Sequence, residues 1–120
     1  MSENIGEDPV AAAKRQIEEV TPEQVLEMQA KTENVVYLDV REPREWNLGH
    51  LPQAVHIPLG NLESKVRDVI PLDQRVVIYC ARGNRSALAA LAMKRMGYGK
   101  VASMARGING WVDINGDVEG

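Results

Sequence analysis

The chain has very few residues of the kinds that build disulfide frameworks or metal sites. Among its 120 residues there is one cysteine, so no internal disulfide can form. The chain has two histidines but no second cysteine, so the sequence shows no recognisable spacing of zinc ligands. A single reduced thiol suits a reducing compartment. We therefore expect neither a disulfide scaffold nor a metal centre.

Long apolar runs and an excess of basic residues are also absent. The longest apolar stretch, residues 87–93, is too short to cross a bilayer. The first residues lack the basic flank and apolar run of a secretory signal. A formal net charge of −3 argues against nucleic acid as the main partner. We expect a cytoplasmic protein that binds neither membranes nor nucleic acid.

The length of the chain predicts one small domain. A chain of 120 residues can bury one hydrophobic core and no more, and the sequence contains no internal repeat or low-complexity segment. Residues 17–118 are expected to form the domain. Residues 1–16 are expected to form a flexible or helical extension, with a mobile tail over 1–8 and one or two helical turns over 9–16.

Strands alternate with helices along this domain. We expect strands over residues 17–20, 35–38, 54–57, 76–79 and 100–104. We expect helices from residue 22 to about 30 and over 43–48, 59–69, 86–96 and 108–112. The first of these helices begins with Thr21 as cap, Pro22 at the first position and Gln24 three residues after the cap. The alternation predicts an α/β domain whose parallel sheet of about five strands is covered by helices on both faces.

The only cysteine, Cys80, directly follows a buried strand and precedes a helix. Ligands of open α/β sheets bind at this end of the strands. Residues 81–85 contain a glycine and an asparagine, which can turn successive N–H groups toward an anion. Together with Arg82 and Arg85 they would stabilise a thiolate, which predicts a nucleophilic cysteine with a lowered pKa. The simpler alternative is that Cys80 is a small buried hydrophobic residue.

Three motifs follow one another along the chain. Residues 39–51 read DVREPREWNLGHL, residues 80–86 read CARGNRS and residues 106–111 read RGINGW. These resemble the D-V-R-E-x-x-E-aromatic-x-x-G-H, C-x-x-G-x-R-S and G-G-h-x-x-W signatures of the rhodanese domain family. They occur in the order and at the spacing of that family and cover about residues 35–111.

The resemblance implies a sulfurtransferase. Cys80 would take a sulfane sulfur from thiosulfate or a persulfide and pass it to cyanide or a thiol, through a covalent persulfide. The donor would be a small sulfur-containing anion or a protein persulfide, the acceptor a thiol, and no cofactor would be needed. The residues expected to bind the anion are Ala81, Arg82, Gly83, Asn84, Arg85, Ser86 and Arg106.

The resemblance also implies four supporting residues, which are Asp39, Arg41, Glu45 and His50. We expect ion pairs and hydrogen bonds that hold the site together, because breaking a partly buried pair is costly. A direct catalytic role for the three charged residues is the other interpretation. His50 is expected to act as a hydrogen-bonding brace, and His56 to point outward from a short strand.

Two positions depart from the family pattern. Gln53 stands where many relatives have glycine, which indicates a slightly different turn. Arg106 stands where the family usually has the first of two glycines. It would either add positive charge at the mouth of the site or be a solvated surface residue.

Two other functions compete with sulfur transfer. Phosphatases and arsenate reductases also use a cysteine loop ahead of an arginine, but with five intervening residues, whereas four separate Cys80 from Arg85. The tighter ring suits a sulfur atom better than a tetrahedral oxyanion. A non-enzymatic module that docks a partner or senses redox state is the second alternative, because an accessible cysteine without a resolving partner is prone to oxidation.

Overall fold

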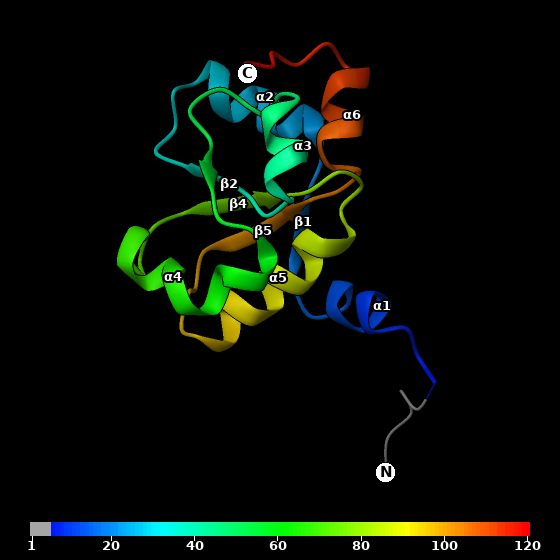
Figure 1. The fold of residues 1–120 in the computed structure, drawn as a ribbon, viewed down its shortest axis with the longest axis vertical. Coiled ribbons are helices and arrows are strands. Elements are labelled where there is room, and N and C mark those ends of the chain that lie inside the picture. The colour runs from blue at the N-terminus through cyan, green and yellow to red at the C-terminus, as the bar shows by residue number, and fades with distance from the viewer. Residues whose placement is uncertain (1–5) are drawn as a thin grey trace.

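A computed structural model describes residues 6–120 and contains a five-stranded parallel sheet (Figure 1). The strands are β1 (Glu18–Val20), β2 (Val36–Asp39), β3 (Val55–His56), β4 (Val76–Tyr79) and β5 (Val101–Met104). Their order in the sheet is β1-β5-β4-β2-β3, and each neighbouring pair is parallel. All five carboxyl ends therefore lie along one edge. The expected α/β class is confirmed.

Helices cover both faces of the sheet (Figure 1). They are α1 (Pro9–Lys14), α2 (Pro22–Ala30), α3 (Pro43–Asn47), α4 (Leu62–Val69), α5 (Asn84–Arg95) and α6 (Gly107–Asp113). Apolar residues of α4 and α5 pack on one face, and those of α2 and α6 pack on the other. A 3₁₀ turn, Leu59–Asn61, precedes α4, so the expected helix over 59–69 begins with a tighter turn.

The central strand β4 is buried on both faces, which explains its uninterrupted apolar sequence. Val76 and Ile78 belong to the core beneath α4 and α5, whereas Val77 and Tyr79 belong to the core beneath α2 and α6. Cys80 continues this alternation and packs in the first core. Strand periodicity therefore directs its side chain toward α5.

The described part of the N-terminal extension contains the helix α1. α1 packs on α5, and its Ala13 is fully buried. Asp8 caps α1 through its carboxylate, and Glu7 pairs with Arg15 at 2.6 Å. Residues 7 and 8 of the expected tail thus make defined contacts, and residues 1–5 of that tail lie outside the described residues.

Local signals set two helix starts. Thr21 and Gln24 form the expected capping box at α2. α5, in contrast, begins at Asn84, two residues earlier than expected, because Gly83 adopts a left-handed conformation with φ 95° and serves as its N-cap. The connecting loop is shorter as a result, and Arg85 and Ser86 belong to the first turn of the helix.

Candidate active site

The Cys80 sulfur lies at the start of α5 among hydrogen-bond donors. The N–H groups of Gly83 and Ser86 donate to Sγ at 3.2 and 3.4 Å, and the Cys80 thiol donates to the Ser86 hydroxyl at 3.5 Å. Burial raises the pKa of the thiol, but hydrogen bonds from Ser86 and from the loop N–H groups outweigh burial and bring the pKa below its ordinary value. The site therefore favours a thiolate.

Helix geometry explains why these donors are available. The first N–H groups of a helix have no carbonyl partner within it, and Ser86 occupies the third position of α5. Gly83, with its positive φ, turns the chain so that its own N–H also faces the sulfur. Its Cα lies close to the backbone of residues 104–106, which leaves little room for a side chain.

An open pocket of about 270 Å³ adjoins Cys80. Its lining consists of Glu45, Cys80, Ala81, Arg82, Asn84 and Arg85. Cys80 itself is only 1% exposed. The structure thus brings six of the seven residues expected to bind the anion to the sulfur or its pocket, Gly83 and Ser86 through their N–H groups.

The two arginines of the pocket differ in how their charge is balanced. Arg85 donates two hydrogen bonds to the Glu45 carboxylate, at 2.7 and 2.9 Å. This pairing lowers the pKa of Glu45 to about 2 and raises that of Arg85. Arg82 is exposed, and within residues 6–120 no acidic side chain pairs with it. Unbalanced positive charge at the pocket therefore comes from Arg82.

A buried ion pair holds the neighbouring loop. Asp39, at the end of β2, pairs with Arg41 at 2.7 Å, and both side chains are almost fully buried. Arg41 also donates to the Gly49 carbonyl at 2.7 Å. The Tyr79 hydroxyl accepts a hydrogen bond from the N–H of Leu51 at 3.1 Å. These contacts attach residues 49–51 to the ends of β2 and β4, outside the Cys80 pocket.

Trp46 of α3 lies between two imidazoles. The His50 ring stacks on it with centroids 3.4 Å apart, and the His56 ring stacks at 4.8 Å. His50 Nδ1 is 3.1 Å from the Trp46 carbonyl, and His56 Nε2 is 2.8 Å from the Arg41 carbonyl. The outward orientation expected for His56 is wrong, because its ring is half-buried in this stack. Neither histidine lines the Cys80 pocket.

The start of α6 supports the cysteine loop from behind. The N–H groups of Ile108 and Asn109 donate to the carbonyls of Cys80 and Ala81, at 2.8 and 3.1 Å. A side chain at Gly107 would overlap these two carbonyls. The close approach of these carbonyls therefore explains why a glycine occupies position 107.

Arg106 does not reach the cysteine. Its guanidinium pairs with Glu23 of α2 at 2.8 Å, and the residue is absent from the lining of the Cys80 pocket. Its backbone, in contrast, is left-handed with φ 66° and lies directly behind Gly83. The Arg106 side chain is therefore not part of the Cys80 pocket.

Ser103 is a site residue that the sequence analysis missed. Its hydroxyl lies 2.7 Å from that of Ser86, and both are fully buried. The sequence signal for this residue was weak, since Ser103 is only one polar residue in an otherwise apolar strand.

Across residues 6–120, no group of three or more histidine, cysteine or acidic residues could hold a metal ion, and no helix there is long and apolar enough to span a membrane.

The chain is similar in sequence to known proteins. The rhodanese-like domain pattern matches residues 21–114. A sulfurtransferase from Allochromatium vinosum is 35% identical over 95 residues, covering 79% of this chain and 88% of that protein. YrkF from Bacillus subtilis, described as a candidate sulfur carrier protein, is 36% identical over 95 residues, covering 79% of this chain and 51% of YrkF. The chain thus spans about half the length of YrkF.

A structural comparison gives the same fold. A solved protein of unknown function from Rhodopseudomonas palustris, described as a possible tyrosine phosphatase, superposes with a TM-score of 0.83. It is 32% identical, and the match covers 92% of this chain and 90% of that one. The fold and site define an α/β protein with a cysteine loop at the carboxyl edge of a parallel sheet. The chain belongs to the rhodanese-like domain family.

Proposed function

We propose that this protein is a sulfurtransferase that carries a sulfane sulfur on Cys80. The observation that carries the proposal is the ring of polar groups around Sγ. The N–H groups of Gly83 and Ser86 donate to the sulfur, and the Ser86 hydroxyl can donate to it once Cys80 has ionised. Such a ring stabilises negative charge on sulfur, first in the thiolate and then in a persulfide. The named sulfurtransferase and sulfur carrier relatives support the same class of reaction.

With thiosulfate as donor, the Cys80 thiolate attacks the outer, sulfane sulfur. A new S–S bond forms to Cys80 while the bond between the sulfane sulfur and the sulfonate sulfur breaks. The electron pair of the broken bond leaves with sulfite, and the enzyme retains a Cys80 persulfide anion. No proton has to be lost in this step when Cys80 is already a thiolate, and the hydrogen bonds that lower the pKa of Cys80 favour that form.

In the second step an acceptor attacks the outer sulfur of the persulfide. Cyanide would leave as thiocyanate and restore the Cys80 thiolate, and a cellular thiolate would leave as a persulfide. Arg82, at the pocket and without an acidic partner, would attract the anionic donor. Arg85 would act mainly through its pair with Glu45, which holds the first turn of α5 against α3.

Asp39, Arg41 and His50 would support the site without touching the substrate. None of the three lines the Cys80 pocket, and their hydrogen bonds attach the loop that follows α3. A phosphatase remains the rival enzyme class, because a structural relative is described as a possible tyrosine phosphatase. The four-residue spacing between Cys80 and Arg85 argues against it, since the loop is shorter than one that wraps a phosphate.

Intact-protein mass spectrometry tests the proposal. Reduced wild-type protein treated with thiosulfate should gain one sulfur atom, and cyanide should remove it with formation of thiocyanate. Cys80→Ser should gain nothing. Absence of an adduct with thiosulfate and with a small-molecule persulfide would contradict the proposal. Hydrolysis of an aryl phosphate that depends on Cys80 would assign the phosphatase class instead.

A further inference from the structure

The charges that line the Cys80 pocket are nearly balanced. The charged lining residues are Arg82, Arg85 and Glu45, so the lining carries one net positive charge while Cys80 is a thiol. Ionisation of Cys80, which the surrounding hydrogen bonds favour, cancels that charge. The reactive pocket therefore has no net positive charge with which to attract a ligand that carries two negative charges.

Glu45 supplies the negative charge that creates this balance. Its carboxylate accepts hydrogen bonds from both terminal nitrogens of Arg85, at 2.7 and 2.9 Å, and from the N–H of Glu42 at 3.0 Å. These contacts hold the carboxylate in the pocket lining. The hydrogen bonds from Arg85 lower the pKa of Glu45 to about 2, so the carboxylate is ionised at neutral pH.

The same ion pair occupies the part of Arg85 that an oxyanion would use. A guanidinium recognises an oxyanion best through two parallel N–H groups, and in Arg85 two such groups are already bonded to Glu45. An oxyanion bound at Arg85 would therefore lie against a carboxylate, and each negative charge on the ligand adds to the repulsion. Among the residues that the structure describes, Arg82 has no acidic partner, so it is the single cation left for a ligand.

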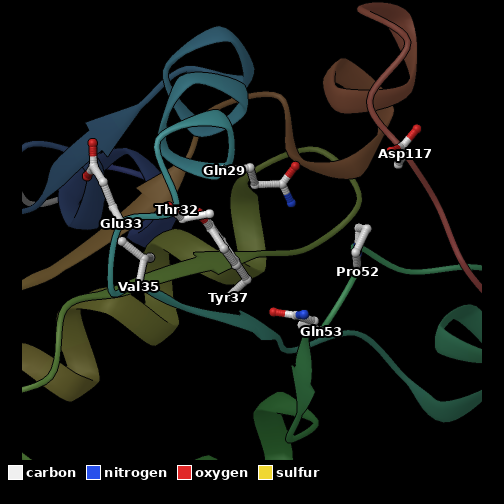
Figure 2. Close-up of a pocket in the computed structure, with 8 residues that line it drawn as sticks. All are labelled: Gln29, Thr32, Glu33, Val35, Tyr37, Pro52, Gln53 and Asp117. Atoms are coloured by element: carbon white, nitrogen blue, oxygen red, sulfur yellow. The ribbon is translucent and has the colours of Figure 1, made fainter.

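A larger pocket elsewhere in the molecule offers no alternative site for an anion. It lies beside the end of α2 and the start of β2, has a volume of about 390 Å³ and shares no lining residue with the Cys80 pocket (Figure 2). Both of its charged lining residues, Glu33 and Asp117, are acidic. Selection among anionic donors therefore takes place at the Cys80 pocket.

We infer that Glu45 determines the specificity of the site by favouring sulfur donors whose reacting end carries a single negative charge. Persulfide and thiosulfonate anions belong to this class, whereas thiosulfate carries two charges. One charge on the donor matches the one unpaired cation, Arg82. Thiosulfate reacts as well, but against the repulsion of Glu45. The inference rests on the function proposed above and defines the class of donor that the site prefers.

Two donors that differ by one charge test this inference. Methanethiosulfonate has a methyl group in place of one oxygen of thiosulfate and is a monoanion. The Cys80 thiolate attacks the outer sulfur of either donor and forms the same persulfide. The electron pair of the broken S–S bond leaves with sulfite or with methanesulfinate. Intact-protein mass spectrometry gives the second-order rate constant of persulfide formation for each donor. Differences in donor reactivity cancel when the ratio of thiosulfate to methanethiosulfonate is compared between variants.

Glu45→Gln should raise this ratio about tenfold, because it removes the like charge beside Arg85 and keeps a side chain of the same length. Glu23→Gln is the matched control, since Glu23 is also paired with an arginine, Arg106, at 2.8 Å, but lies outside the Cys80 pocket. It should change the ratio by less than about twofold. An unchanged ratio in Glu45→Gln, even with slower transfer from both donors, or an equal rise in both variants would overturn the inference.

Binding without transfer separates this inference from the proposed function. Sulfate and methanesulfonate differ by the same charge and contain no sulfane sulfur, and each should slow alkylation of Cys80 by iodoacetamide when it occupies the pocket. The affinity of sulfate relative to methanesulfonate should rise about tenfold in Glu45→Gln and should not rise in Glu23→Gln. If Cys80 accepts sulfur from neither donor, the proposed function fails, but this rise would still support charge selection by Glu45. Absence of the rise would overturn it.

Discussion

The hydroxyl of Ser103 on β5 lies 2.7 Å from the hydroxyl of Ser86 on α5, and Ser86 in turn contacts the Cys80 sulfur. Both serines are fully buried. When Cys80 ionises, Ser86 can donate to the sulfur while it accepts a hydrogen bond from Ser103. The thiolate is therefore held by a chain of two hydroxyl groups, one of which comes from a neighbouring strand.

Removing either hydroxyl should make the thiolate less stable. The Ser86 side chain makes the largest pKa-lowering contribution to Cys80, so Ser86→Ala should raise this pKa, and Ser103→Ala should raise it less. Alkylation by iodoacetamide at pH 7 should slow about tenfold in the first variant and about threefold in the second. Ser64→Ala, on the exposed side of α4, serves as control. Unchanged rates in both variants would contradict the hydroxyl chain.

Stability at acid pH should depend on Glu45. Its pKa in the folded protein, about 2, lies below its ordinary value of 4.5, mainly because of the hydrogen bonds from Arg85. The stabilising contribution is therefore complete above pH 4.5 and is lost as the pH falls toward 2. The pair is partly exposed, so we expect about 1 kcal/mol.

Urea unfolding at several pH values measures this contribution. Glu45→Gln should be less stable than wild type by about 1 kcal/mol at pH 6, and this difference should shrink as the pH falls below 4. Glu63→Gln, which lies on the exposed face of α4, should show no such trend. A difference that stays constant from pH 6 to pH 2.5 would show that the ion pair is not its cause.

Gly107→Ala should destabilise the protein and displace the cysteine loop. A methyl group there would overlap the carbonyls of Cys80 and Ala81, and the φ of 53° disfavours any side chain. We expect a loss of about 2–4 kcal/mol in the free energy of unfolding and slower alkylation of Cys80. Gly99→Ala, with open space around it and no positive φ, should change stability by less than about 0.5 kcal/mol. Equal stability of the two variants would rule out the close approach of the start of α6 to the carbonyls of Cys80 and Ala81.

Lys14 should assist binding of an anionic donor. Its ammonium donates to the Asn84 carboxamide at 3.3 Å, and Asn84 lines the Cys80 pocket. If the proposed function holds, Lys14→Ala should raise the KM for thiosulfate about twofold to threefold and leave kcat unchanged. Lys65→Ala on α4 should leave both constants unchanged. A fall in kcat without a change in KM would indicate that α1 acts on the loop structure instead.

Much of this protein was predictable from local sequence signals. The apolar run before Cys80 predicted a buried strand, and Thr21 with Gln24 predicted the start of α2 correctly. The apolar run, the loop that contains Gly83 and the helix formers after it were enough to place Cys80 at the carboxyl end of a strand, next to a helix start. Each of these signals acts over a few residues, so no tertiary contact is needed to infer it.

Contacts between distant segments were decided by the tertiary structure alone. Ser103 meets Ser86 because β5 pairs with β4 in one particular register, and Arg106 turns toward Glu23 because α6 packs beside α2. The pocket lined by Gln29, Tyr37, Pro52 and Asp117 likewise combines α2, β2 and three loop segments. The sequence by itself determined which elements form and where the cysteine lies, since propensity and periodicity are local. The packing of those elements decided which side chains meet, because that depends on register and helix placement.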